Sequence, residues 1–177
     1  MSEDREYKLG EIIISEDQIK ARARELGVEI SREYAGEGVL VIGILKGAVL
    51  WMSDLIKCID IPVKIDFMAV SSYGAATRSS GVVRILKDLD ADILGQNVII
   101  VEDIVDSGVT LNYLKEYLLG RGPKSLKICA LLDKPSGRRA AIDVDYVGFT
   151  VDDVFIVGYG LDVNQQFRNL PFVTSVL

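Results

Sequence analysis

The chain has 177 residues, of which 49% are hydrophobic and 26% charged, and this composition predicts one soluble globular domain with a sizeable core. Its 20 basic and 26 acidic residues give a net charge of −6, which argues against a nucleic-acid-binding surface because such surfaces normally carry a basic stripe. The sequence contains no histidine, so imidazole catalysis and histidine-ligated metal are excluded. Acid–base chemistry must therefore use Asp, Glu, Lys, Tyr or Cys.

Neither a leader nor a membrane segment is predicted. Residues 1–6 are charged and lack the apolar region of a signal peptide, and no apolar run approaches the roughly 20 residues that span a bilayer. We therefore expect a cytoplasmic protein without membrane contact. Cys58 and Cys129 each lie in an apolar run, and buried free thiols are favoured over a disulfide.

The first predicted element is an amphipathic helix over residues 16–34. Ser15, followed three residues later by Gln18, forms a capping box at its start. Gly36 and Gly38 end it. The apolar residues between these signals recur at helical spacing, at Ile19, Ala23, Leu26 and Ile30.

Apolar strands and covering helices alternate through the rest of the chain. The predicted strands cover residues 39–45, 63–70, 82–86, 98–101, 126–132, 146–151 and 155–159. Predicted helices cover residues 48–59 and the stripe of Leu111, Leu114 and Leu118. This alternation predicts an α/β fold with a central, mainly parallel sheet flanked by helices. Residues after 162 are expected to be mostly irregular.

We expect one domain over residues 1–177. Its core should cover about 36–132, and segments from both ends (about 1–35 and 134–177) should pack together as a small hood over the strand C-termini. Residues 71–81 are small, polar and without periodicity, which predicts a mobile loop.

The strongest functional signal lies between Asn97 and Thr110. An apolar run at 98–101 is followed directly by Glu102 and Asp103, and then by a small-residue loop at 106–110 that opens a helix. Ligands of open α/β sheets bind outside the strand C-termini, and a helix N-terminus there is a ready anion site. Adjacent strand residues point to opposite faces, so both acids should reach one ligand only if the strand ends at them, as the loop residues suggest.

Surface acids at a loop are the alternative interpretation of this stretch. Three acids at Glu102, Asp103 and Asp106 would, however, repel each other unless a ligand or cation offset their charge. Mg²⁺ is commonly held by one or two carboxylates together with substrate phosphates. The loop lacks the spaced glycines and the lysine of a Walker A motif, which argues against a nucleoside triphosphate site. The pattern therefore predicts a site for a sugar phosphate.

This stretch resembles the phosphoribosyl-pyrophosphate motif of the type I phosphoribosyltransferase family, in which four apolar residues precede two acids and then an acid with a Ser/Thr-Gly loop. Further motifs resemble, in the same order, those of hypoxanthine-guanine phosphoribosyltransferases. They are Leu45-Lys46-Gly47, Ser71-Ser72-Tyr73-Gly74, Leu132-Asp133-Lys134-Pro135, the run from Val154 to Asp162, and Phe167-Arg168-Asn169-Leu170. The resemblance covers the chain from about Ile12 to Val176.

The resemblance implies a purine-salvage enzyme. Such an enzyme transfers the 5-phosphoribosyl group from phosphoribosyl pyrophosphate to N9 of hypoxanthine or guanine, giving IMP or GMP and pyrophosphate, with Mg²⁺ as cofactor. Two alternatives stay open: a transferase that prefers xanthine and guanine, and a regulator that kept the fold but binds nucleic acid. The net charge of −6 argues against the second. Relatives are homodimers or homotetramers, and the sequence does not choose between them.

The resemblance also implies roles on the sugar-phosphate side. Asp106 is the general base that takes the proton from purine N7. Glu102 and Asp103 hold the ribose hydroxyls, directly or through Mg²⁺. The 5′-phosphate is bound by Asp106, Ser107, Gly108, Val109 and Thr110. Some relatives have lysine where this chain has Val109, but the grip comes from backbone N–H groups and hydroxyls.

Pyrophosphate and purine contacts are implied by the remaining motifs. Lys46, Gly47 and Arg168 would bind pyrophosphate, with a cis peptide bond expected between Leu45 and Lys46. Asp162 would lie near the purine and orient a second Mg²⁺. The purine would be bound by Lys134 through its 6-oxo oxygen, by Phe155 through stacking and by the backbone of Ile156. Residues 71–81 would form a flexible lid, whose Ser72 and Tyr73 would exclude water.

Overall fold

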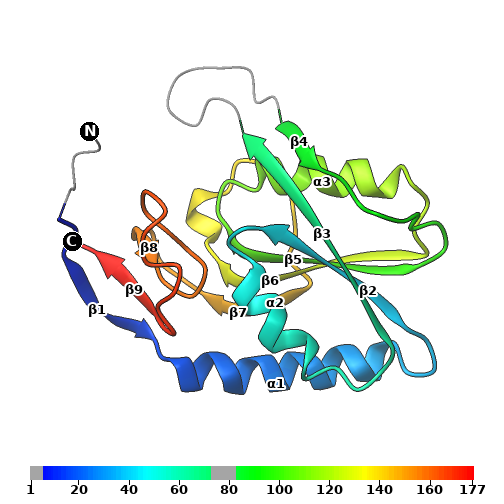
Figure 1. Cartoon of the computed structure of the whole chain (residues 1–177), viewed down its shortest axis with the longest axis horizontal. Helices are drawn as coiled ribbons and strands as arrows, with labels where there is room; N and C mark the ends of the chain where they lie inside the picture. The colour runs from blue at the N-terminus through cyan, green and yellow to red at the C-terminus, as the bar shows by residue number, and fades with distance from the viewer. Residues whose placement is uncertain (1–5, 73–82) are drawn as a thin grey trace.

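The computed structural model describes residues 6–72 and 83–177 (Figure 1). It contains a six-stranded sheet in the order β4-β3-β2-β5-β6-β7 and a three-stranded sheet in the order β1-β9-β8. The helices are α1 (Glu16–Glu33), α2 (Val49–Ile56) and α3 (Val109–Leu119), with a short 3₁₀ helix at Pro135–Gly137. The strands are β1 (Leu9–Ile14), β2 (Val39–Leu45), β3 (Val63–Ser72), β4 (Val83–Lys87), β5 (Asn97–Val105), β6 (Ser125–Asp133), β7 (Tyr146–Thr150), β8 (Ile156–Val157) and β9 (Val173–Val176).

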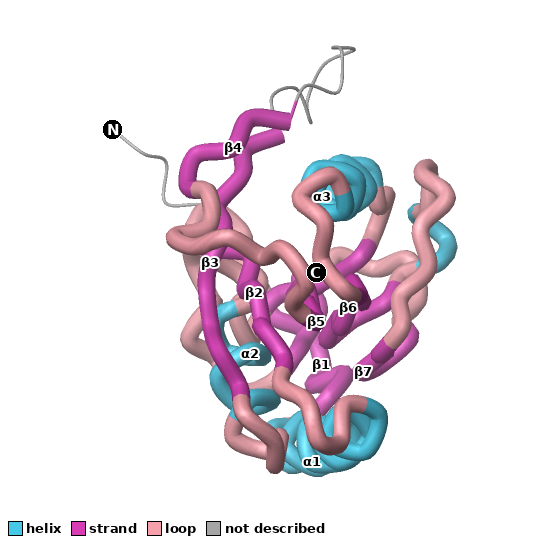
Figure 2. Tube along the Cα trace, turned by 90° about the vertical axis from the view of Figure 1, so that its right-hand side faces the viewer, coloured by secondary structure: helices cyan, strands magenta, loops and turns pink. Residues whose placement is uncertain are grey.

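The six-stranded sheet confirms the predicted α/β fold. Strands β3, β2, β5, β6 and β7 run parallel, and β4 returns antiparallel to β3 as the predicted hairpin. Helices α1 and α2 cover one face of the sheet and α3 covers the other (Figure 2). Because both faces are covered, β2 and the first half of β5 are almost entirely apolar.

Helix α1 begins as predicted. The Ser15 hydroxyl accepts from the Gln18 N–H at 3.2 Å, and the Gln18 side chain accepts from the Ser15 N–H at 2.8 Å. Its apolar stripe is buried against α2 and against β7, so α1 packs on the main sheet. The main layer therefore extends beyond the predicted limits of 36–132, because α1 and β7 both belong to it.

The three-stranded sheet joins the two ends of the chain (Figure 1). β9 pairs antiparallel with both β1 and β8, and the Thr174 hydroxyl donates to the carbonyls of Gly10 and Glu11 at 3.0 and 2.8 Å. Neither β1 nor β9 was predicted from the sequence, and the tail after residue 162 is less irregular than expected. β1 pairs only with a strand more than 150 residues away, and β9 has only four residues, so no local pattern marks either strand.

Smaller departures from the predictions occur at element ends. Helix α2 covers Val49–Ile56 rather than residues 48–59, and β8 has only two residues. Both cysteines are free thiols; Cys129 is buried, which raises its pKa to about 12, whereas Cys58 is half-buried. Among the described residues, no helix combines the length and apolar character that crossing a membrane requires.

Candidate active site

The predicted site residues gather where the parallel strands end. Strand β5, however, does not stop at Glu102 as expected but continues to Val105, because β6 pairs with it as far as Asp133. Its partner on the other side, β2, leaves it after Val101. The end of β5 thus has no strand partner on the side of β2, where the Lys46-Gly47 turn packs against Asp103 instead.

Glu102 and Asp103 begin on opposite faces of β5. Glu102 lines a pocket of about 160 Å³ together with the loop at 106–110 and the start of α3. Asp103 lies against the turn after β2, where a Cβ at Gly47 would overlap its carboxylate. A larger residue at position 47 would therefore force Asp103 to move, and Asp103 is in direct contact with the Lys46-Gly47 turn.

The two carboxyls are electrostatically unfavourable neighbours. Burial, followed by the negative charge of Asp103, raises the pKa of Glu102 well above its usual range. Burial also raises the pKa of Asp103, although its own backbone contacts and the charge of Arg168 oppose the shift. A pair that is poorly satisfied alone is suited to an incoming hydrogen-bond donor or cation.

The phosphate loop, residues 106–110, leads from β5 into α3. Gly108 adopts φ +74° at the N-cap, a left-handed conformation that favours glycine, and α3 starts at Val109. The Gly108 N-cap supplies no side-chain hydrogen bond, and the first amides of a helix have no intrahelical partner. The hydroxyl of Ser107 lies 3.5 Å from the Val109 nitrogen. A helix N-terminus with hydroxyls beside it has the chemistry that an anion site requires.

The expected pyrophosphate residues lie together on the far side of the acid pair. The Leu45–Lys46 peptide bond is cis, as predicted. The Arg168 guanidinium donates to the Gly160 carbonyl at 2.6 Å and pairs with Asp162 at 2.8 Å, and a Cβ at Gly160 would overlap the Gly47 carbonyl. The loop that carries Asp162 and Arg168 is therefore packed directly on the Lys46-Gly47 turn.

The expected purine residues lie on the other side of Asp106. The Lys134 ammonium is 3.7 Å from the Asp106 carboxylate and 2.6 Å from that of Asp153, and the Asp153 contact is the main reason that the pKa of Lys134 is raised. Phe155 is 59% exposed, which is unusual for an aromatic residue at a sheet end, whereas Ile156 is buried. A pocket of about 410 Å³ is lined by Asp106 and Lys134 among others.

Most of the predicted lid lies outside the described part of the chain. Tyr73 and most of the lid at 71–81 are not described, and of Ser72 only the backbone is, as the last residue of β3. The prediction that these residues exclude water therefore stays a prediction.

The carboxylates of the site are suited to a Mg²⁺ ion that also binds substrate and water, rather than to a metal held by protein side chains alone. Within the described ranges, no three acidic or cysteine side chains cluster closely enough to hold a metal by themselves. Glu102 and Asp103 instead offer two half-buried carboxylates with raised pKa values, and Asp162 lies near the pyrophosphate residues. This fits an ion that takes one or two protein oxygens and completes its shell with water and substrate.

Three residues of the site were missed by the sequence analysis. Asp153 pairs with Lys134, Gln165 accepts from Lys46 at 3.3 Å and from Arg168 at 3.4 Å, and Arg138 contacts the phosphate loop. Each is a polar residue in a loop, and its partner is far away in sequence or across a turn. The only signal that the sequence offers is proximity to a motif, which Gln165 and Arg138 share with many solvent-exposed residues.

Comparison with known proteins assigns this arrangement to a family. A model of the phosphoribosyl transferase domain matches residues 13–164, so the chain belongs to the phosphoribosyltransferase family. It is 52% identical over 167 residues to the hypoxanthine-guanine phosphoribosyltransferase of Bacillus subtilis, covering 94% of this chain and 93% of that protein. It is 53% identical to the bifunctional protein TilS/HprT of Listeria innocua over 92% of this chain, which spans 25% of that longer protein.

Solved structures give the same result for the fold. The crystal structure of a hypoxanthine-guanine phosphoribosyltransferase from Bacillus anthracis, with a HEPES molecule in its active site, has a TM-score of 0.92 to this chain. The two are 47% identical, and the match covers 96% of this chain and 100% of the other. The fold is therefore that of the type I phosphoribosyltransferases, as predicted.

Proposed function

We propose that this chain transfers the 5-phosphoribosyl group from phosphoribosyl pyrophosphate to N9 of hypoxanthine or guanine, forming IMP or GMP and releasing pyrophosphate. The observation that carries the proposal is the order of groups along the carboxyl ends of the strands: Lys46 and Arg168, then the acid pair, then Asp106, then Lys134. This order matches the order pyrophosphate, ribose and base in the reacting molecules. The relatives named above carry the same activity in their names.

Bond breaking to pyrophosphate would run ahead of bond making to the purine, which leaves positive charge on the ribose ring. Glu102 and Asp103 would accept hydrogen bonds from the ribose hydroxyls and stabilise that charge. Asp106 would take the proton from purine N7 as N9 attacks. Lys46, Gly47 and Arg168 would bind the leaving pyrophosphate, for which the planar guanidinium is well suited.

Mg²⁺ is the proposed cofactor: Glu102 and Asp103 would hold one ion, Asp162 would orient a second, and the bound metal would neutralise pyrophosphate charge as a Lewis acid. The 5′-phosphate would be held by the backbone amides of the phosphate loop and by the hydroxyls of Ser107 and Thr110. Lys134 would donate to the purine 6-oxo oxygen, Phe155 would stack on the ring, and the Ile156 backbone would bind the base edge. Ser72 and Tyr73 would close over the site.

An ammonium group has only hydrogen-bond donors, so Lys134 favours a 6-oxo group over the 6-amino group of adenine. Selectivity at the 2-position is not fixed by these side chains, and a preference for xanthine and guanine is the alternative. The proposal also includes a single domain with a hood of chain ends and a cytoplasmic location. It further includes an assembly of two or four copies, whose mass light scattering would measure.

Steady-state kinetics with phosphoribosyl pyrophosphate, MgCl₂ and each of hypoxanthine, guanine, xanthine and adenine test the proposal directly. We expect turnover of hypoxanthine and guanine and negligible turnover of adenine. A dominant activity with xanthine would favour the alternative transferase. Absence of nucleotide formation with all four bases would refute the proposed function.

A further inference from the structure

The segment that carries Lys134 folds back onto the phosphate loop. The Lys134 N–H donates to the Val105 carbonyl at 3.0 Å, and the N–H groups of Arg139 and Ala140 both donate to the Ser107 carbonyl at 2.9 and 3.0 Å. Residues 134–140, here called the clasp, are therefore attached by backbone hydrogen bonds to both sides of Asp106.

The side chain of Arg138 adds further hydrogen bonds between the clasp and the phosphate loop. Its Nη1 lies 3.3 Å from the Val105 carbonyl oxygen and 3.3 Å from that of Asp106, and its Nη2 pairs with the Asp133 carboxylate at the end of β6. A guanidinium presents its donors in a rigid plane, so it links these three acceptors in one fixed geometry. The side chain is 19% exposed.

The contact leaves little free space. A Cβ at Gly137 would overlap the Asp106 carboxylate, and a Cβ at Gly108 would lie 3.3 Å from Arg138 Cδ and 2.6 Å from a methyl group of Ile142. The Asp106 side chain itself is 52% exposed, and its carboxylate is contacted by Gly137 and lies 3.7 Å from the Lys134 ammonium. Its position depends on these contacts with the clasp and on the backbone to which Arg138 is bonded.

Arg138 is not among the residues that line the 160 Å³ pocket inside the phosphate loop. It contacts the loop through the carbonyl oxygens of Val105 and Asp106, and it lines the 410 Å³ pocket with Asp106 and Lys134. Both Nη atoms already donate to acceptors within the protein, which favours a role in positioning over direct binding of the phosphate.

We propose that Arg138 is a positioning residue that holds Asp106 and the phosphate loop in fixed register with Lys134. The base subsite and the 5′-phosphate subsite are thereby coupled, and a ligand that fills both benefits most. The proposal rests on the proposed function for its kinetic consequences, but the physical link between the clasp and the loop does not depend on it.

The test compares Arg138→Gln and Arg138→Lys with Arg121→Gln in the full chain. Arg121 is a matched control because its guanidinium also pairs with a carboxylate, Asp88 at 3.0 Å, and approaches a carbonyl, that of Ala91 at 3.4 Å, but far from the site. We expect Arg138→Gln to lower kcat about 10- to 100-fold, as misplacement of a reacting group does. IMP affinity should fall with it, whereas the KM for hypoxanthine should change by about threefold or less.

Arg138→Lys should have a higher kcat than Arg138→Gln but the same melting temperature. The ammonium keeps some hydrogen-bond donors but lacks the planar fork of the guanidinium. In Arg121→Gln, kcat should stay within about twofold of the parent, whatever its melting temperature. Equal kcat in Arg138→Gln and the parent, or losses in both arginine variants that follow their stability, would overturn the proposal.

Hydrogen–deuterium exchange of residues 105–111 supplies a readout that needs no activity. Exchange should accelerate there in Arg138→Gln but not in Arg121→Gln. Unchanged exchange would overturn the positioning role. If exchange is unchanged and only the KM for phosphoribosyl pyrophosphate rises, Arg138 binds the phosphate directly instead. If the parent protein forms no nucleotide, the proposed function fails, and the exchange result still decides the role of Arg138.

Discussion

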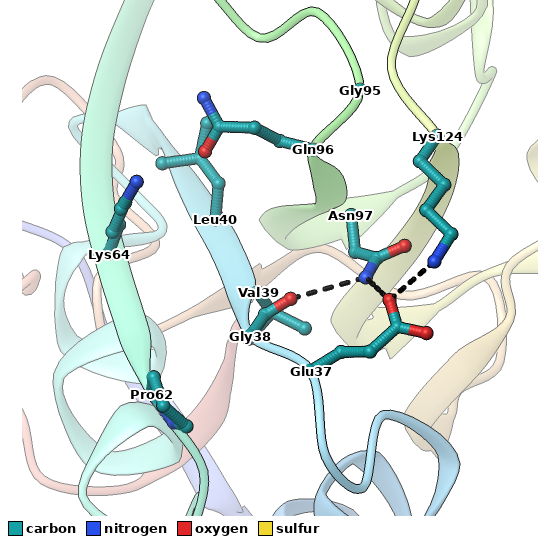
Figure 3. A pocket seen from close by; sticks show the side chains of 10 residues that line it. All are labelled: Glu37, Gly38, Val39, Leu40, Pro62, Lys64, Gly95, Gln96, Asn97 and Lys124. Carbon is teal, nitrogen blue, oxygen red and sulfur yellow. Dashed lines mark hydrogen bonds and ion pairs between the residues drawn. The ribbon is translucent and has the colours of Figure 1, made fainter.

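Carboxylates near the two ends of strand β5 are in opposite electrostatic states. At its start, Asn97 donates to Glu37 at 2.6 Å and accepts from the Ser125 hydroxyl at 2.9 Å, and Lys124 pairs with Glu37 at 2.8 Å beside a pocket of about 300 Å³ (Figure 3). The contacts with Lys124 and Asn97 lower the pKa of Glu37.

A second carboxylate, Glu33, also has hydrogen-bond partners within the protein. Glu33 accepts from Lys127 and from the Tyr146 hydroxyl, and these two hydrogen bonds lower its pKa. At the other end of β5, the pKa of Glu102 is raised by burial and by Asp103. One end of the strand thus has partners for its acids within the protein, and the other leaves them for a ligand. Sites arranged for ligands commonly reduce stability in this way.

The largest expected effect follows from removing the general base. Asp106→Asn should lower kcat by roughly 10²–10⁴-fold, the usual contribution of such a base, because the amide cannot accept the N7 proton. Affinity for phosphoribosyl pyrophosphate, measured by titration calorimetry, should change little. Near-normal turnover would remove Asp106 from this role.

Next in size is the loss of the purine-binding ammonium. Lys134→Gln should lower kcat/KM for hypoxanthine by about 10- to 100-fold, the range of a hydrogen bond to a charged group. Because an amide can both donate and accept, discrimination against adenine should weaken in the same variant. Competition kinetics with both bases measures this ratio, and an unchanged ratio contradicts the assignment.

A smaller effect is expected at Glu102, where removing a carboxylate should stabilise the protein instead of destabilising it. Glu102→Gln should raise the melting temperature of the protein without ligand or Mg²⁺, by about 2–4 °C for each 1 kcal/mol of relieved repulsion. The raised pKa means that the penalty in the parent grows as pH rises above the ordinary glutamate value and disappears in acid. The gain should therefore be present at neutral pH and absent near pH 4, as melting curves across this range would show.

The smallest effect is expected at the opposite edge, where the sign reverses. Glu33→Gln should lower the melting temperature slightly at neutral pH, since the lowered pKa reflects stabilisation by Lys127 and Tyr146. That stabilisation is lost as pH falls through the lowered pKa, so the two proteins should converge in acid. Turnover of Glu33→Gln should equal that of the parent, and a large loss of turnover would break the contrast between the two edges.

The sequence predicts the parts of this molecule that depend on local pattern. The capping box of α1, the apolar strands β2 and β5 and the loop that opens α3 are each marked within about ten residues. The extension of β5 to Val105 was missed because Glu102 and Asp103 are polar and only their pairing with β6 keeps them in the strand. Arg138 and Asp153 were missed because their contacts arise from how loops fold back on the site.

Thermal unfolding with and without phosphoribosyl pyrophosphate and MgCl₂ tests the central contrast most directly, when the parent, Glu102→Gln and Glu33→Gln are compared. A ligand that binds only the folded state raises the melting temperature by an amount that grows with the logarithm of ligand concentration over Kd. We predict a large increase for the parent, the same increase for Glu33→Gln, and a much smaller one for Glu102→Gln despite its more stable unliganded form. An equal ligand-induced increase in Glu102→Gln and the parent would contradict the assignment of the acid pair to the sugar-phosphate site.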